Sequence, residues 1–514
     1  MFKKFRLSAG ALGFTIAGAI TAAIFLLNSC GDSETEKAGN RLVEGKELSQ
    51  KYCASCHKYP EPILLDKITW EKGVLPVMAG QLGIQSEMGQ LYADAHSLLT
   101  VDDYNKIVEF YKSAAPAKLI IPKQSAVKDW AVFTLKRPAK VDKGTPAMTT
   151  MVKFNPLDQR LYTGDMGNKL LSWDKQLNAK LVKTTPSAIT AANFYREGGK
   201  NRGTFTCIGV LPPNDYLKGI LEDVDLDTKK PTAKLLTDSL PRPVQTAAAD
   251  FNKDGLTDYI VCGYGNTKGG LYLVQHQADH RFKKKVIRAV PGAIQVETGD
   301  FNNDGWPDVM CLFAQADEGV WLFLNDRRGG FTTQNLLRFP PVYGSNSFQL
   351  VDVNNDGKKD IIYTCGDNND YSSILKPYHG LYVFTNLGNW KFKQTYFYQI
   401  NGASKAMAAD FDSDGDMDIM TIAFFADFKY HPTESVIYME QTGANRFKPH
   451  EVPVNKYGRW IAMEVADVDG DGDQDVVLGN FSVFGDKLIN QEGFKPNWDM
   501  NEPVIMLQNT TKQK

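Results

Sequence analysis

Short apolar runs alternate with acidic, glycine-containing turns throughout the C-terminal half of the chain. The first such turn reads Asp-Phe-Asn-Lys-Asp-Gly-Leu-Thr-Asp from Asp250 and runs directly into the apolar stretch Tyr259–Cys262. The same pattern, D-x-[DN]-x-D-G-x-x-D followed by an apolar run, starts again at Asp300, Asp352, Asp410 and Asp467. The intervals are 50, 52, 58 and 57 residues. A period of this length is typical of a repeated unit that buries its apolar faces against its neighbours.

Each period has room for four short strands. In the second repeat one strand precedes Asp300, and three follow at residues 308–314, 319–325 and 331–339. Tracing the pattern backwards gives two repeats without the acidic set, near residues 146–185 and 186–240. We therefore predict a mainly β fold, a seven-bladed β-propeller over residues 146–514, with six or eight blades as alternatives.

The last repeat lacks a fourth strand. The chain ends soon after Val504–Gln508, which has the character of a third strand. The stretch Trp130–Leu135, within the predicted linker 117–145, has the character of the missing one. We predict that it pairs with the last blade and closes the ring, which would protect both edges.

Residues 41–116 have the pattern of a small all-α domain in front of the propeller. One helix is predicted over Glu44–Tyr52, and a second opens at Val101 and ends at Pro116.

Four cysteines lie in the predicted propeller. We predict that they are small, buried apolar residues too far apart for disulfides. They are Cys207, Cys262, Cys311 and Cys365.

The N-terminus has the layout of a secretory signal. Three cationic residues precede the uncharged stretch Leu7–Leu27, which meets Leu27-Asn28-Ser29-Cys30. This ending resembles a bacterial lipobox, which implies a signal peptide over residues 1–29, lipidation of Cys30 and a tether over 30–40. The protein is then expected to be exported and lipid-anchored to a bacterial membrane, at the periplasmic face or the cell surface. An uncleaved transmembrane anchor is the alternative.

Composition narrows the classes of function. With 43% hydrophobic residues among 514, the chain is no disordered protein, and a single apolar stretch excludes a polytopic transporter. A formal net charge of −2 argues against a nucleic-acid partner.

Cys53-Ala54-Ser55-Cys56-His57 is the CxxCH signature of covalent haem attachment. The two thiols add to the haem vinyl groups, and His57 reaches the iron. No second cysteine pair lies nearby to complete a zinc site. Residues 41–116 resemble a class I cytochrome c domain, so we expect one covalent haem c.

The resemblance suggests a methionine as the sixth iron ligand. Leu75–Gly80 resembles the distal loop of that family, which favours Met78, with Met88 and His96 as competitors. Alternatively, Met78 belongs to a helical core stripe, because apolar residues recur around it at i+4 spacing. A methionine ligand would raise the haem potential and suit an electron carrier.

The acidic turns carry oxygen ligands at positions 1, 3, 5 and 9 with a turn-forming glycine at position 6, a pattern suited to Ca²⁺. Position 12 holds no glutamate in any copy, so an EF-hand is excluded. The turns resemble the calcium loops of FG-GAP (VCBS-type) repeats in integrin-like propellers, which implies about five bound Ca²⁺. The predicted ligands are Asp250, Asn252, Asp254, Asp258, Asp300, Asn302, Asp304, Asp308, Asp352, Asn354, Asp356, Asp360, Asp410, Asp412, Asp414, Asp418, Asp467, Asp469, Asp471 and Asp475.

Loops between the second and third strands lie at the end of the propeller opposite the acidic turns. Several are long and polar, which is usual for a recognition surface, although solvation alone also explains such residues. The candidate ligand face, for a second metal or a polar substrate, comprises Asp317, Glu318, His379, His431 and Glu434.

These parts favour a membrane-anchored monohaem cytochrome for electron transfer, fused to a calcium-stabilised propeller that binds a partner or substrate. One alternative is a cell-surface propeller that binds a glycan or protein and carries an accessory haem. The other is a dehydrogenase that passes substrate electrons to the haem. Since no catalytic constellation is identifiable by spacing, an electron-transfer or binding protein is favoured over an enzyme.

Overall fold

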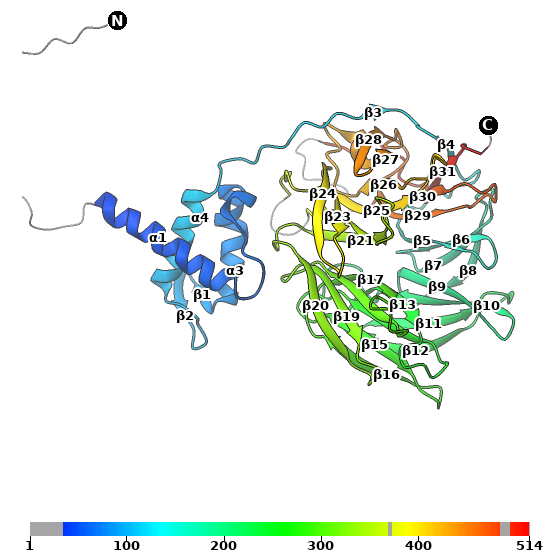
Figure 1. Ribbon diagram of the computed structural model, residues 1–514, viewed down its shortest axis with the longest axis horizontal. Coiled ribbons are helices and arrows are strands. Elements are labelled where there is room, and N and C mark those ends of the chain that lie inside the picture. The colour runs from blue at the N-terminus through cyan, green and yellow to red at the C-terminus, as the bar shows by residue number, and fades with distance from the viewer. Residues whose placement is uncertain (1–33, 369–372, 484–493, 513–514) are drawn as a thin grey trace, which may run out of the picture.

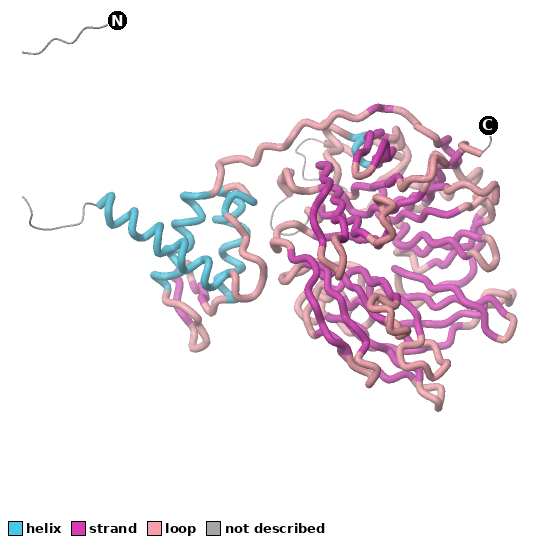
Figure 2. The backbone as a smooth tube through the Cα atoms, in the orientation of Figure 1, coloured by secondary structure: helices cyan, strands magenta, loops and turns pink. Residues whose placement is uncertain are grey.

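The computed structural model describes residues 34–368, 373–483 and 494–512. A small helical unit stands beside a larger ring of β-sheets, and a long connection runs over the ring to reach its far side (Figures 1 and 2). The predicted signal peptide and the predicted lipidation site, Cys30, lie outside the described residues. No helix within the described ranges is long and apolar enough to cross a membrane.

Seven four-stranded antiparallel blades form the ring, so the predicted mainly β, seven-bladed propeller is confirmed. Blades 1 and 2 comprise β5 (Thr149–Asn155), β6 (Arg160–Asp165), β7 (Lys169–Trp173) and β8 (Ala179–Thr184), then β9 (Ile189–Glu197), β10 (Lys200–Cys207), β11 (Gly219–Asp225) and β12 (Ala233–Leu240). Blades 3 and 4 comprise β13 (Pro243–Ala249), β14 (Asp258–Gly263), β15 (Gly270–His276) and β16 (Phe282–Arg288), then β17 (Ala293–Gly299), β18 (Asp308–Phe313), β19 (Gly319–Asn325) and β20 (Phe331–Arg338).

The remaining blades follow the same order. Blades 5 and 6 comprise β21 (Ser345–Val351), β22 (Asp360–Cys365), β23 (Gly380–Asn386) and β24 (Phe392–Gln399), then β25 (Ala403–Ala409), β26 (Asp418–Ala423), β27 (Val436–Gly443) and β28 (Arg446–Glu451). Blade 7 comprises β29 (Trp460–Ala466), β30 (Asp475–Asn480) and β31 (Val504–Asn509), with β4 (Phe133–Lys136) as its fourth strand. A short 3₁₀ turn, η3 (Pro432–Ser435), precedes β27.

The ring is closed by a strand from the N-terminal side. β4 pairs antiparallel with β31, with Phe133 opposite Asn509 and Leu135 opposite Leu507. Just before it, β3 (Val127–Lys128) adds a parallel edge to β28 of blade 6. The segment that precedes the first blade is thus paired with blades 6 and 7. Blade 7 therefore has its fourth strand, and the ring is closed.

Burial follows position within a blade. The second strands, such as β14 and β18, are buried at every residue because neighbouring blades cover both their faces. The fourth strands lie at the rim and carry exposed polar residues, as at residues 283–285. This gradient explains why the second strands are continuous apolar runs in the sequence.

Polar side chains join the innermost strands of adjacent blades. The Gln295 side chain of β17 donates to the Phe348 carbonyl (2.6 Å) and accepts from the Phe348 N–H (3.1 Å) on β21. Gln349 of β21 likewise accepts from the Ala408 N–H of β25 (2.7 Å). Each blade is therefore hydrogen-bonded to the next along the wall of the central channel.

The helical unit has its own core. Its elements are α1 (Glu34–Cys53), η1 (Pro62–Leu64), α2 (Lys67–Thr69), η2 (Trp70–Val74), α3 (Leu75–Gln81), β1 (Ile84–Glu87), β2 (Gln90–Ala93) and α4 (Val101–Ala114). Trp70, Ile107 and Tyr111 are almost fully buried between these elements. Thr100 and Asp103 form a reciprocal capping box that starts α4.

The prediction of an all-α unit is wrong in one place. β1 and β2 form an antiparallel hairpin whose turn is Met88-Gly89, with φ of +48° and +81°. Two successive left-handed residues are what a tight hairpin turn requires, and glycine supplies one of them without strain.

The four propeller cysteines are buried and free, as predicted. The Cys311 thiol lies close enough to Cys262 to interact with it, although both thiols are free. Both side chains belong to the core cluster between blades 3 and 4, where neighbouring second strands converge.

Ring closure provides a direct test. Phe133 is 2% exposed and packs edge-to-face on Phe411 and Tyr438 of blade 6, with ring centroids 5.4 and 5.5 Å away. Phe133→Ala should lower the stability by about 3 kcal/mol or more, because it leaves a cavity where the ring closes. The thermal unfolding midpoint of the full chain measures this. Thr134→Ala, exposed on the same strand, is the control, and equal midpoints for both variants would contradict the prediction.

Candidate metal loops and CxxCH segment

Five loops of the same shape join the first and second strands of blades 3 to 7, so all lie at one end of the propeller. In the first loop the fourth and sixth positions, Lys253 and Gly255, have φ of +58° and +83°. The other loops repeat both left-handed positions, at Asn303 and Gly305, Asn355 and Gly357, Ser413 and Gly415, and Gly470 and Gly472. Glycine adopts this conformation without strain, which explains the Asp-Gly pair in every copy.

The first aspartate of each loop holds the turn together. In the second copy, the Asp300 carboxylate accepts from the backbone N–H of Asp304 (2.9 Å) and of Gly305 (2.7 Å). The side chain at position 3, Asn302, accepts from the same Asp304 N–H (3.0 Å). The oxygens of positions 1 and 3 therefore converge on one backbone N–H inside the turn. In blades 6 and 7 the carboxylate that joins them within metal-binding distance is the one at position 9.

The ninth aspartate is buried in all five loops. Each uses both oxygens: Asp308 accepts from the N–H of Phe301 in its own loop (2.9 Å) and of Asn325 at the end of the third strand (2.8 Å). Asp258, Asp360, Asp418 and Asp475 repeat this pair of bonds with their own loops and third strands. The side chain thus fixes the loop to the blade that it belongs to.

Burial disfavours the ionised form of these carboxyl groups. Burial, together with neighbouring acids, raises the pKa of Asp258 to about 6 and that of Asp418 and Asp475 to about 7. For Asp308 and Asp360 the pKa is raised for the same reasons. A divalent cation among the loop oxygens would favour the ionised forms and reverse these shifts.

Two loops bring three carboxylates together. Among the described residues, the groups of His, Cys, Asp or Glu that could hold a metal are Asp410, Asp412 and Asp418, and Asp467, Asp469 and Asp475, each with ligand atoms within 4.8 Å of one another. The first three loops carry asparagine at position 3, which gives an oxygen ligand without charge. The two acid triads are candidate Ca²⁺ sites, and the fold gives the other three loops the same shape.

Each loop also contacts the next blade. The side chain at position 2 packs into the adjoining blade's core: Phe251 against blade 4, Phe301 against blade 5, Val353 against blade 6, Phe411 against blade 7 and Val468 against blade 1. Four of these residues also accept through their carbonyls from a side chain of the next blade, as in Asn325 to Phe251 (2.9 Å) and Trp390 to Phe301 (2.8 Å). The loops therefore hold neighbouring blades together, a role that the sequence pattern did not reveal.

The CxxCH segment follows the C-terminal end of α1. Cys53 is half-buried beside the Tyr111 hydroxyl, burial raises its pKa to about 11, and Cys56 is exposed. The His57 Nδ1 lies 3.0 Å from the Lys58 carbonyl oxygen, so it carries the proton and leaves Nε2 free to bind a metal. The pKa of His57 is lowered, chiefly by burial.

The candidates for a sixth ligand differ in position. The segment Leu75–Gln81 forms α3, not the loop that the resemblance implies, because its apolar residues form one buried helical stripe. Met78 packs half-buried on the helical core, as the alternative interpretation predicted. Met88 is 99% exposed at the hairpin tip, and His96 is exposed. Of the three, Met78 is the one that touches the core.

Three residues of the predicted ligand face have structural roles. Asp317 pairs with Arg288 (2.9 Å) and Arg338 (2.6 Å). Glu318 is buried and accepts from the Ser345 N–H (3.0 Å) and hydroxyl (2.6 Å). His379 is buried, and burial, with Lys376 nearby, lowers its pKa.

His431 and Glu434 form a separate group in blade 6. The His431 Nδ1 lies 3.1 Å from an Asp427 carboxylate oxygen and 3.9 Å from one of Glu434. Burial raises the pKa of Glu434 to about 7. The groups of described residues whose ligand atoms lie close enough to hold a metal are the two acid triads, and this cluster is not among them.

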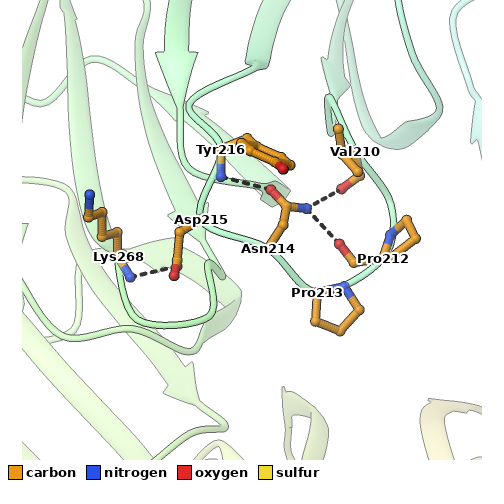
Figure 3. Close-up of a pocket in the computed structure, with 7 residues that line it drawn as sticks. All are labelled: Val210, Pro212, Pro213, Asn214, Asp215, Tyr216 and Lys268. Carbon is orange, nitrogen blue, oxygen red and sulfur yellow. Dashed lines mark hydrogen bonds between the residues drawn. The ribbon is translucent and has the colours of Figure 1, made fainter.

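A cleft lies between the loops that join the second and third strands of blades 2 and 3, at the end of the ring opposite the acidic loops (Figure 3). The Asn214 amide donates to the Val210 and Pro212 carbonyls (3.0 and 2.6 Å), and Asp215 accepts from the N–H groups of Thr267 and Lys268 (2.6 and 2.8 Å). These bonds hold the pKa of Asp215 at about 2. The polar groups that line the cleft are thus hydrogen-bonded to the loops that form it.

Similarity to known proteins covers part of the chain. A family model described as an FG-GAP-like repeat matches residues 250–311 and 300–363, which include the first three acidic loops. No curated protein matches.

Among solved structures, the β-propeller domain of Myceliophteria thermophila Cps50 (Swd1) is 12% identical, with a TM-score of 0.41 over 66% of this chain and 96% of that one. An ancestral GH74 enzyme is 10% identical, with a TM-score of 0.44 over 73% of this chain and 51% of that one.

Removal of calcium should loosen the ring. Occupancy of one site at 100 times its dissociation constant contributes about 2.7 kcal/mol, so a chelator should lower the unfolding midpoint of the full chain. Calorimetry in EGTA and in excess CaCl₂ measures the shift. MgCl₂ should restore little of it, since Mg²⁺ requires a stricter octahedral geometry. Identical midpoints with and without chelator would contradict the prediction.

The charge of the side chain at position 3 of each acidic loop should change the affinity of that loop for Ca²⁺. Asp412→Asn keeps an oxygen ligand but removes a charge, so calcium should bind blade 6 about tenfold more weakly. Asn302→Asp should strengthen binding in blade 4. Calcium titration calorimetry resolves both, with Asp238→Asn, an exposed acid of blade 2, as the charge-matched control. Equal effects of Asp412→Asn and the control would refute a ligand role for Asp412.

Proposed function

We propose that the protein is a membrane-tethered, monohaem c-type cytochrome whose calcium-stabilised propeller binds a redox partner or substrate. The CxxCH segment carries the proposal. It offers two free thiols three residues apart, followed by a histidine whose Nδ1–H is held by a backbone carbonyl. A metal-binding histidine needs this tautomer, because the other ring nitrogen must keep its lone pair.

The surface of the helical unit supports a large apolar group. Seven large apolar side chains of this small unit are more than a third exposed: Val43, Ile63, Ile68, Val77, Met88, Tyr92 and Leu98. These side chains offer apolar area that a large apolar group could bury. The donor set and this surface together fit a covalently attached haem.

Each residue of the CxxCH segment would have a separate role in binding the haem. Cys53 and Cys56 would hold the haem through thioether bonds, and His57 would ligate its iron, with Met78 favoured as a further protein ligand. The group supplies one-electron transfer when bound. The Lys58 carbonyl orients the His57 ring, and Tyr111 packs beside Cys53.

Calcium has a structural role in this proposal. The loops lie at the end of the propeller opposite the long connecting loops, and their bonds join each blade to the next. Bound cations would therefore hold the scaffold that presents the loops of the other end. Recognition of a redox partner, a glycan or another protein is assigned to that end.

The location rests on the sequence alone. The signal pattern of residues 1–29 and the lipobox-like Cys30 support export and a lipid anchor at the periplasmic face or cell surface. Export also suits haem attachment, which takes place outside the cytoplasm.

Co-expression of the full chain with a c-type maturation system tests the proposal. The purified protein should carry one haem, measured by the pyridine haemochrome spectrum, and Cys53→Ser/Cys56→Ser should carry none. With Met78 bound, the reduced spectrum should not change under carbon monoxide, whereas Met78→Ala should open the iron and shift it. A haem-free wild-type protein would refute the cytochrome assignment.

A further inference from the structure

The CxxCH side of the helical unit rests on the rim of blades 4 and 5. Val342, in the turn between these blades, and Ile374, in the long loop of blade 5, pack on the helical unit's core. The Tyr378 hydroxyl of the same loop lies 3.0 Å from the Leu64 carbonyl oxygen, to which it donates. The predicted ligand face is therefore partly covered by the chain's own N-terminal unit.

A polar network continues this contact to the CxxCH segment. The Lys58 ammonium donates to the Arg338 carbonyl (3.1 Å), and the Arg338 guanidinium makes a longer contact to the Cys56 carbonyl (3.5 Å). Arg338 and Asp317 lie close enough to His57 to act on its pKa in opposite directions, Arg338 lowering it and Asp317 raising it. Two residues of the propeller thus belong to the immediate surroundings of the CxxCH segment.

The network is held rigidly from the propeller side. Asp317 accepts from Arg338 (2.6 Å) and from Arg288 (2.9 Å). The Arg288 guanidinium is stacked over the Trp321 ring, 3.7 Å from its centroid, and over Phe313 at 4.3 Å. The aromatic rings fix Arg288, which fixes Asp317, which in turn orients Arg338 toward the helical unit.

The polar network places cations next to the segment. Lys58 lies beside the CxxCH residues and Arg338 reaches them from the propeller, where Asp317 pairs with it and the buried Glu318 follows Asp317 in the same loop. A cation close to the segment favours the reduced, less positive form of an attached redox group, so the charge of Arg338 would raise its reduction potential. Because Arg338 is partly exposed, solvent screens part of this effect.

We propose that the rim of blades 4 and 5 is the docking surface for the CxxCH segment, and that Arg338 is a positioning residue that holds the segment there and raises the potential of the attached group. The electrostatic half of this statement rests on the proposed haem function. The docking half does not, because its contacts are made by the polypeptide alone.

The test compares three variants of the full chain. Arg338→Gln removes the charge and the ion pair, whereas Arg338→Lys keeps the charge and loses the forked geometry. Arg328→Gln is the matched control, an exposed arginine in the hairpin that precedes β20, at the opposite end of the same strand. Thermal unfolding verifies that all three fold.

Docking is read by hydrogen exchange of the haem-free Cys53→Ser/Cys56→Ser chain. Peptides covering residues 56–65 should exchange about threefold to tenfold faster in Arg338→Gln, as expected for loss of a charge-assisted contact, and at the wild-type rate in Arg328→Gln. Unchanged exchange in Arg338→Gln would overturn the docking role.

The electrostatic role is read by redox titration of the haem-loaded chain. The midpoint potential should fall in Arg338→Gln, stay near the wild-type value in Arg338→Lys and not move in Arg328→Gln. An unchanged potential in Arg338→Gln would overturn this role while leaving the cytochrome assignment in place. A wild-type chain without haem would instead refute that assignment, and the exchange experiment would still decide the docking.

Discussion

The buried aspartate at position 9 of each acidic loop is the interaction on which the ring depends. Its two oxygens tie the loop to the end of the third strand of the same blade, through backbone N–H groups at 2.7–3.2 Å. The residue held in this way, at position 2, then places its side chain in the core of the next blade. A single carboxylate thus sets both the shape of a loop and the contact between two blades, and a fully buried anion needs charge compensation.

Blade 2 compensates buried carboxylates without the acidic pattern. Its third strand carries Glu222 and Asp223, both buried, which pair with Lys183 of blade 1 and with Arg202 in the same sheet. Protein cations thus compensate these two buried carboxylates.

The sequence predicts the regular features well because each has a local cause. The blade period, the turn glycines and the missing fourth strand follow from patterns within a few residues, and the structure contains seven blades and the β4–β31 pair. Features set by contacts across the chain were missed. Glu318 and His379 read as polar loop residues, yet Glu318 caps the turn at Ser345, and His379 is enclosed by the loop of blade 5. Met78 similarly fits both a buried helical stripe and the position of an iron ligand. Residue spacing alone does not distinguish these two interpretations.

The two ends of the propeller are connected through blades 4 and 5. At the acidic end, Trp390 of blade 5 donates to the Phe301 carbonyl in the loop of blade 4, and Phe301 itself lies in the core of blade 5. At the other end, the same two blades form the rim that receives the CxxCH segment. Blades are stiff sheets, so the loop that fixes their relative position at one end also fixes the separation of Arg338 and Tyr378 at the other. A cation at the Asp300 loop would therefore stabilise the docking surface through the width of the ring, although it lies at the opposite end.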